Sequence, residues 1–150
     1  MLEENLAERL FKEQQEVTRS KDRFRLSVIR LLRSELHNGA IAKKMPLDAQ
    51  EELAILTREV KRRQEALGDY ERSGRDALVN DLKKEIEILK EYLPVQLSEE
   101  ELKKLVNEAI TESGAVTGRD MGKVMSLLMP RIKGRADGGQ VRQLVERILQ

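Results

Sequence analysis

The chain has 150 residues, of which 37% are charged, 39% are hydrophobic and only 3% are aromatic. The 28 basic and 27 acidic residues leave a net charge of +1, so any affinity for nucleic acid must come from local clusters. The lack of cysteine excludes disulfides and thiolate metal sites and suits a reducing cytosol. Helix-forming residues dominate and only three prolines occur, which predicts an all-α fold.

The beginning of the chain and its hydropathy argue against secretion and membrane insertion. The first residues, MLEENLAERLFKEQ, are acidic, whereas a secretory signal needs a basic start and an apolar core. No stretch approaches the roughly 20 apolar residues that a membrane-spanning helix requires. We therefore expect a cytoplasmic protein without a membrane partner.

Apolar residues at helical spacing predict two helices at the start of the chain, over residues 2–18 and 21–37. Ser20 is the expected N-cap of the second helix. Asn38 and Gly39 tolerate the left-handed conformation and are expected to end it. The expected core positions are Leu2, Leu6, Leu10 and Val17 with Phe11 alongside, then Phe24, Val28, Leu31, Leu32 and Leu36.

Two further helices are predicted before residue 94. Asp48 and Glu51 have the spacing of a capping box, and Gly74 marks the next interruption. Over residues 75–92, apolar steps of three and four define a seam that suits packing against an antiparallel helix, so we expect hairpins. The seam consists of Leu78, Leu82, Ile86, Leu89 and Leu93.

Basic residues are dense in and just before the second predicted helix. They are opposed only by Asp22 and Glu35. Two interpretations remain open: a solvated face with local salt bridges, or a strip of side chains that contacts phosphate groups. The residues concerned are Arg19, Lys21, Arg23, Arg25, Arg30 and Arg33.

Pro94 marks the expected domain boundary, because proline cannot continue a helix and favours an extended conformation at the preceding residue. We predict an N-terminal helical domain over residues 1–93 and a C-terminal three-helix domain over residues 94–150. Each of the three helices begins with a capping residue that is followed three positions later by a polar partner. The pairs are Ser98 and Glu101, Thr117 and Asp120, and Asp137 and Gln140.

Apolar stripes predict that the three short helices share a common core. The second of these helices is expected to break around Pro130. The stripes are Leu102, Leu105, Val106 and Ala109; Met121, Val124, Met125 and Leu128; and Val141, Leu144, Val145 and Ile148.

Positive charge collects in the last third of the chain. From Gly114 onward there are seven basic residues against three acidic ones, and several flank Gly134, where a backbone can approach a ligand closely. RNA recognised by shape is contacted through its phosphates and 2′-hydroxyls by such donors. The candidate RNA-binding residues are Arg119, Lys123, Arg131, Lys133, Gly134, Arg135 and Arg142. In the alternative interpretation Gly134 and Asp137 are helix caps only, and the cations are solvated surface.

Catalytic and metal-binding patterns are not apparent in the sequence. His37 is the single histidine and has neither a cysteine nor a second histidine to form a metal site with it. There is no nucleophile elbow, phosphate-binding glycine loop or HExxH motif. We predict that the protein is not an enzyme, with no catalytic residues, no metal and no cofactor.

Four segments together resemble the YqeY family of small bacterial proteins, and the resemblance covers nearly the whole chain. They are RLSVIRLLRSEL at 25–36, LKKEIEILKEYLPVQLSEEEL at 82–102, MGKVM at 121–125 and KGRADGGQV at 133–141. The family is similar to the tail region of GatB, a subunit of glutamine-dependent aspartyl/glutamyl-tRNA amidotransferases.

The resemblance implies a helical N-terminal region followed by a three-helix tail. In GatB the tail is associated with gripping the tRNA body, while amide transfer belongs to other domains and subunits. Similar modules are appended to some glutaminyl-tRNA synthetases. The GxVM and KGxA segments of the tail match Gly122, Val124 and Met125, then Lys133, Gly134 and Ala136, with SLLMPRI between them.

These observations predict a non-catalytic tRNA-binding accessory module. Binding is expected to be weak, salt-sensitive and selective for folded RNA over duplex DNA. A tRNA-modifying or aminoacylating enzyme is the second expected partner, assisted in trans. The alternatives are a helical protein–protein adaptor without nucleic-acid binding, and a helix-turn-helix DNA binder, for which the last helix offers few base-reading side chains.

Overall fold

A computed structural model describes residues 4–150 and contains seven α-helices and one short 3-10 helix, with no strand among these residues. The prediction of an all-α fold is confirmed. The chain forms two compact units, one ending at Leu93 and one comprising Pro94–Gln150. We call them the N-terminal unit and the tail unit.

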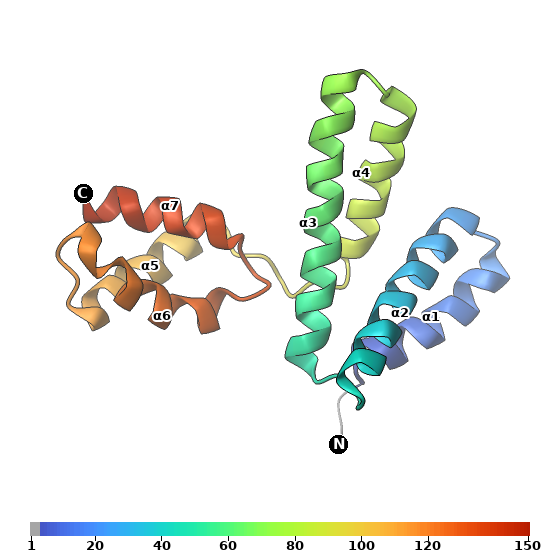
Figure 1. Cartoon of the computed structure of the whole chain (residues 1–150), viewed down its shortest axis with the longest axis horizontal. Coiled ribbons are helices and arrows are strands. Elements are labelled where there is room, and N and C mark those ends of the chain that lie inside the picture. Colours follow the sequence, from blue (N-terminus) through green and yellow to red (C-terminus); the bar gives the residue numbers. More distant parts are fainter. Residues whose placement is uncertain (1–3) are drawn as a thin grey trace. The chain divides into compact units, whose positions relative to one another are not determined.

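The N-terminal unit consists of two helical hairpins (Figure 1). The first pairs α1 (Leu6–Ser20) with α2 (Arg23–Lys43), and the second pairs α3 (Ala49–Ser73) with α4 (Asp76–Lys90). Both connections are short, so consecutive helices lie side by side and run in opposite directions, as the seam in α4 predicted.

The helix caps of the first hairpin differ from the prediction. Asp22, not Ser20, caps α2, because its carboxylate accepts the backbone N–H of Arg25 at 3.1 Å. The helix does not end at Asn38 and Gly39. It continues to Lys43, and Lys44 takes the left-handed conformation that closes it.

Gly39 has a packing role instead. A Cβ atom at this position would lie 2.7 Å from Cδ1 of Ile55, on α3, and 3.4 Å from Cδ1 of Leu47. The glycine therefore allows α2 to approach these apolar side chains closely, which explains why a poor helix former stands inside α2.

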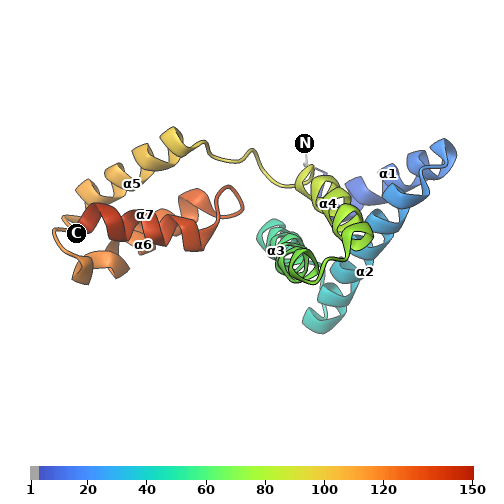
Figure 2. The same cartoon turned by 90° about the horizontal axis from the view of Figure 1, so that it is seen from above.

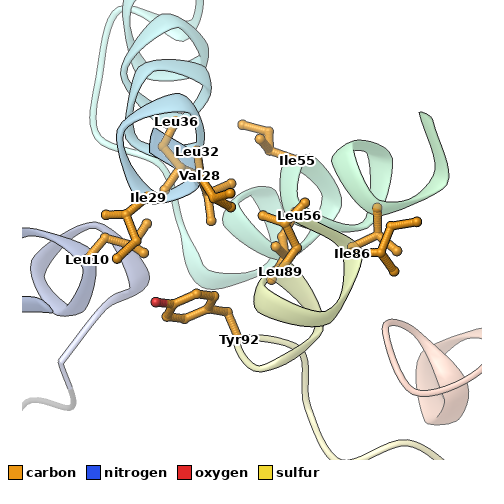
Figure 3. Close-up of a cluster of buried hydrophobic side chains, with 11 residues drawn as sticks. Leu10, Val28, Ile29, Leu32, Leu36, Ile55, Leu56, Ile86, Leu89 and Tyr92 are labelled. Atoms are coloured by element: carbon orange, nitrogen blue, oxygen red, sulfur yellow. The ribbon is translucent and has the colours of Figure 1, made fainter. Parts of the chain in front are cut away.

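The core of the N-terminal unit joins all four of its helices (Figure 3). Three predicted core residues lie on the surface instead: Phe11 is 50% exposed, Leu31 43% and Leu78 41%. Neighbouring apolar residues on the same helices, Ile29 and Val79, are buried in their place. Leu2, also predicted to belong to this core, lies outside the described residues. The buried cluster comprises Leu10, Val28, Ile29, Leu32, Leu36, Ile55, Leu56, Val60, Ile86, Leu89 and Tyr92.

The hydroxyl of Tyr92 anchors the end of α4 to α1. Its ring belongs to the core, while the oxygen points toward α1 and donates a hydrogen bond to Glu13 (Figure 3). Burial, together with this hydrogen bond, raises the pKa of Tyr92 to about 12. Arg9 lies over the same ring, 4.7 Å from its centroid. The last residues of the N-terminal unit are thus held in place by polar as well as apolar contacts.

Two buried polar clusters join the helices of the same unit. Glu52 of α3 is 5% exposed, and its carboxylate accepts the N–H groups of Leu6 and Ala7 at 3.2 and 3.0 Å. It therefore caps the first turn of α1 from a different hairpin. Within the second hairpin, Arg63 of α3 donates hydrogen bonds to Glu59 on the same helix and to Glu85 on α4, each at 3.0 Å.

The tail unit consists of α5 (Glu99–Ser113), the 3-10 helix η1 (Gly118–Asp120), α6 (Met121–Ile132) and α7 (Gly138–Leu149) (Figure 2). Ser98 and Asp137 cap α5 and α7 as predicted. Their side-chain oxygens accept backbone N–H groups three residues later, at 3.1 and 3.3 Å.

The core of the tail unit is entirely aliphatic. On α7 the buried residue is Leu149 rather than the predicted Ile148, which is 40% exposed. The buried cluster comprises Val106, Ala109, Val124, Leu128, Ile132, Val141, Val145 and Leu149.

Pro130 does not break α6, contrary to the prediction. The helix continues to Ile132, and the N–H of Lys133 still bonds the carbonyl of Met129 at 3.1 Å. Proline removes one helical hydrogen bond and strains the preceding turn. Ile132 is only 1% exposed, so its burial in the shared core offsets this loss and keeps the last turn helical.

Candidate nucleic-acid surface of the tail unit

The N-terminal end of α6 is fixed by a carboxylate. Asp120 accepts the N–H groups of Val116 and Thr117 at 2.9 and 3.3 Å. These two hydrogen bonds, and then the nearby charge of Lys123, lower the pKa of Asp120 below its ordinary value. The loop before η1 is therefore tied to the helix start, where the candidate residues Arg119 and Lys123 both lie exposed to solvent.

The turn between α6 and α7 holds three more candidate residues, and two of them make contacts within the unit. Gly134 has a φ of 75°, a backbone conformation that residues with a side chain rarely adopt. Its carbonyl accepts a hydrogen bond from Nε2 of Gln96 at 2.8 Å. Nε of Arg135 donates to the carbonyl of Val95 at 3.2 Å, and the carbonyl of Arg135 accepts the N–H of Leu97 at 2.9 Å. The turn therefore holds the segment that enters the unit.

Arg131 also makes an internal contact. Its Nη2 lies 2.8 Å from Oε2 of Glu112 on α5, in an ion pair whose side chains are 35% and 49% exposed. An exposed pair of this kind contributes at most about 1 kcal/mol to stability. This contact occupies Nη2, so a phosphate group shares or competes with Glu112 for the guanidinium.

Four of the predicted cations make neither an ion pair nor a side-chain hydrogen bond with residues 4–150. Arg119, Lys123, Lys133 and Arg142 are exposed, and none has an acidic side chain within ion-pair distance among residues 4–150. They form two groups rather than one cluster. Arg119 and Lys123 lie at the start of α6, whereas Lys133 follows its end and Arg142 lies in α7. A helix of 12 residues separates the two groups by roughly 18 Å.

Accessible backbone accompanies the cations at three glycines besides Gly134, the glycine at which the sequence predicted a close approach of a ligand. A Cβ atom added at Gly118, Gly122 or Gly138 would meet no atom within 4 Å, so none of these glycines is required by packing. All three lie at helix starts, next to the candidate side chains. The signal in the sequence was the recurrence of glycine at such starts, where it leaves the backbone N–H groups accessible.

Charge is distributed unevenly over the helices of the tail unit. Most acidic residues lie on α5, where five of them outnumber two lysines, whereas η1, α6, α7 and their connections carry more basic than acidic residues. The acidic residues of α5 are Glu99, Glu100, Glu101, Glu108 and Glu112. A polyanion would therefore meet attraction on the α6 and α7 side and repulsion on α5.

Neither a metal-binding arrangement of side chains nor a membrane-spanning helix occurs among the described residues. Within residues 4–150 no group of three or more His, Asp or Glu side chains is arranged to hold a metal ion. Over the same residues, no helix has the length and the apolar character needed to cross a membrane.

Fold and surface together define a class of protein: an all-α chain of two helical units, with exposed basic side chains on the second. The family model described as Yqey-like protein matches residues 7–149, almost the whole chain. The protein therefore belongs to the YqeY family, as the four segments of the sequence predicted. A comparison with curated proteins finds no match.

Proposed function

We propose that this protein is a tRNA-binding accessory module whose tail unit grips the RNA backbone. The observation that carries the proposal is the set of four exposed cations, Arg119, Lys123, Lys133 and Arg142, that have no carboxylate partner among residues 4–150. A cation that stabilises no internal ion pair is free to replace the counterions of a phosphate group.

The placement of these cations favours recognition by shape over the reading of base sequence. They lie near both ends of α6 and in α7, and glycines at the helix starts present backbone donors. Such groups contact phosphates and sugars, and they carry no sequence information by themselves. The start of α7 offers only Gln140, Arg142 and Gln143 for contacts with base edges. These are few base-reading side chains for a helix that binds in the major groove of DNA.

The proposal assigns no chemical step to the chain. Its role is to supply affinity for tRNA, which assists an enzyme that modifies or aminoacylates the same RNA. The tRNA-gripping role associated with the GatB tail supports this assignment, because the two share the GxVM and KGxA segments. In this chain those segments form the start of α6 and the turn before α7.

The test is a binding experiment with unfractionated tRNA and duplex DNA across a salt series. The variant Arg119→Gln/Lys123→Gln/Lys133→Gln/Arg142→Gln removes these four cations and leaves the internal contacts of Arg131 and Arg135 intact. The control variant, Lys83→Gln/Lys90→Gln/Lys103→Gln/Lys104→Gln, changes the net charge equally at exposed lysines on α4 and α5.

The proposal expects the wild-type chain to prefer tRNA and the control to behave like it. Each phosphate contact contributes roughly 0.7 to 0.9 to the magnitude of the negative slope of log K against log salt. The loss of four contacts therefore reduces this magnitude by about 3. Equal effects of the two variants would mean that net charge alone governs binding. If the wild-type chain binds neither nucleic acid at low salt, the proposal fails, and an adaptor that binds a protein partner becomes the better account.

A further inference from the structure

A second set of free cations lies on the N-terminal unit, around α2. Most arginines near this helix have partners: Arg25 pairs with Glu91, Arg33 bonds to Gln14, and Nη2 of Arg58 on α3 lies 3.6 Å from Oε2 of Glu35. The unpaired cations among the described residues of this region are Arg19, Lys21, Arg23 and Arg30, all of them exposed.

The two unpaired arginines of α2 lie on one face of the helix. Arg23, Ser27, Arg30, Ser34 and His37 follow one another at steps of three and four, and all five are exposed. Residues at such steps share one face. We call this set the α2 strip. It lies opposite the residues that α2 buries, which are Val28, Ile29, Leu32 and Leu36.

No carboxylate is available to neutralise the α2 strip from its own helix. Asp22 is occupied as the N-cap of α2, and Glu35 lies on another face beside Arg58. The turn that precedes the strip adds positive charge, because Arg19 ends α1 and Lys21 stands in the left-handed conformation between the helices. Positive potential is therefore concentrated at one end of the hairpin.

We propose that the α2 strip is a second RNA-backbone surface, separate from the one on the tail unit. The inference rests on the proposed function, since it assigns an additional contact to the same class of ligand. Arg23 and Arg30 are seven residues apart, or roughly 10 Å along the helix. Two arginines at this separation bind two different phosphate groups, and the serine between them faces the sugar.

The hydroxyl of Ser27 suits that position. It donates its proton to the carbonyl of Phe24 at 2.7 Å, which leaves its lone pairs to accept a hydrogen bond. The 2′-hydroxyl of RNA is a donor of this kind, whereas a deoxyribose lacks it.

A protein partner fits the α2 strip less well. Protein interfaces are built around apolar and aromatic side chains at their centre, and the centre of this strip contains arginine and serine. Ile41, 59% exposed, follows only at its far end. Charge complementarity thus commits the strip to a polyanion.

The test uses the full chain and the variant Arg23→Gln/Arg30→Gln, with Lys83→Gln/Lys90→Gln as the control of equal charge. Arg23 opens α2, where a cation opposes the helix dipole, so its replacement does not weaken the helix. Circular dichroism and urea unfolding verify that both variants fold. The measured quantities are the affinity for tRNA and its salt slope, beside those of the variant with four substitutions in the tail unit.

The α2 strip predicts about tenfold weaker binding for Arg23→Gln/Arg30→Gln and a slope lower by about 1.5, with the control unchanged. If only the tail variant weakens binding, the strip is overturned while the proposed function stands. If only the strip variant weakens it, the tail surface is wrong and the strip stands. If the wild-type chain does not bind tRNA, both proposals fail.

Discussion

The two units differ in how many of their charged residues form ion pairs. Of the ten ion pairs among residues 4–150, nine lie in the N-terminal unit and one in the tail unit. The three charged side chains that are buried within the described part of the chain, Glu52, Glu59 and Arg63, also belong to the N-terminal unit. The core of the tail unit contains only aliphatic residues.

This difference separates charges that hold the fold together from charges that are free to act. Glu52 and Arg63 join helices of the N-terminal unit, and their removal is expected to destabilise it. The tail unit reaches its fold by aliphatic packing and helix caps, so its exposed cations are not needed for stability. The proposed function therefore rests on where the unpaired cations of the tail unit lie, and not on the overall charge of +1.

The largest effect is expected at the buried charge cluster of the N-terminal unit. Arg63→Ala leaves the buried Glu59 and its neighbour Glu85 without the guanidinium that joins them, which lowers the free energy of unfolding by about 3–5 kcal/mol. Urea unfolding followed by circular dichroism measures the loss. A loss below about 1 kcal/mol would contradict a structural role for this cluster.

The matched change in the tail unit removes apolar packing. Leu128 is 0% exposed, and Leu128→Ala is expected to cost about 3 kcal/mol through lost burial and the cavity that remains. Met129, the next residue, is 42% exposed, so Met129→Ala is the control and should cost less than about 0.5 kcal/mol. Thermal and urea unfolding of both variants test the aliphatic core. Equal costs would refute the assignment of buried and exposed faces on α6.

A smaller effect distinguishes two glycines inside helices of the N-terminal unit. Gly39→Val places its side chain against Ile55, and overpacking of this kind costs about 1–3 kcal/mol. Gly68, within α3, has only Nη2 of Arg72 within 4 Å of an added Cβ. Gly68→Ala should therefore stabilise the protein by about 0.5–1 kcal/mol, because alanine favours helix. The midpoints of urea unfolding measure both effects. If both substitutions lower the midpoint, a packing role specific to Gly39 is contradicted.

The smallest effect concerns pH and the tail unit. The pKa of Asp120 is lowered in the folded state, so the unfolded state binds more protons at acidic pH. The free energy of unfolding therefore decreases as the pH decreases. The contribution is complete above the ordinary aspartate pKa of about 3.9 and is lost as the pH falls through the lowered folded value.

Asp120→Asn should therefore be less stable than the wild type at pH 7 and should lose less stability between pH 5 and pH 3. Glu146→Gln, which alters an exposed carboxylate on α7, is the control. Urea midpoints at several pH values measure the difference, and parallel curves for the wild type and Asp120→Asn would exclude a role for this carboxylate.

Helix caps and helical spacing in the sequence predicted much of the fold. Asp48 forms its capping box with Glu51, and Ser98 and Asp137 cap their helices, because these effects act within one turn of the chain. The errors arose where packing between helices decides the outcome. Gly39 and Pro130 weaken a helix locally, yet the contacts of Gly39 with Ile55 and the burial of Ile132 keep both helices intact.

The sequence predicted which basic residues make up the candidate surface, but not which of them contact other residues of the chain. The density of arginine and lysine after Gly114 is visible in the sequence. The pairing of Arg131 with Glu112 and the hydrogen bond from Arg135 to Val95 join residues 19 and 40 positions apart. Only the folded chain distinguishes these two arginines from the four candidate cations that make no such contact.

The most direct test of the central claim is the acetylation of lysines in the 150-residue chain with and without saturating tRNA, measured by mass spectrometry. The account predicts that tRNA protects Lys123 and Lys133, the free lysines of the tail surface. Four exposed lysines on α4 and α5 should react as before: Lys83, Lys90, Lys103 and Lys104. Protection of these four, with Lys123 and Lys133 still reactive, would contradict the claim that the free cations of the tail unit grip RNA.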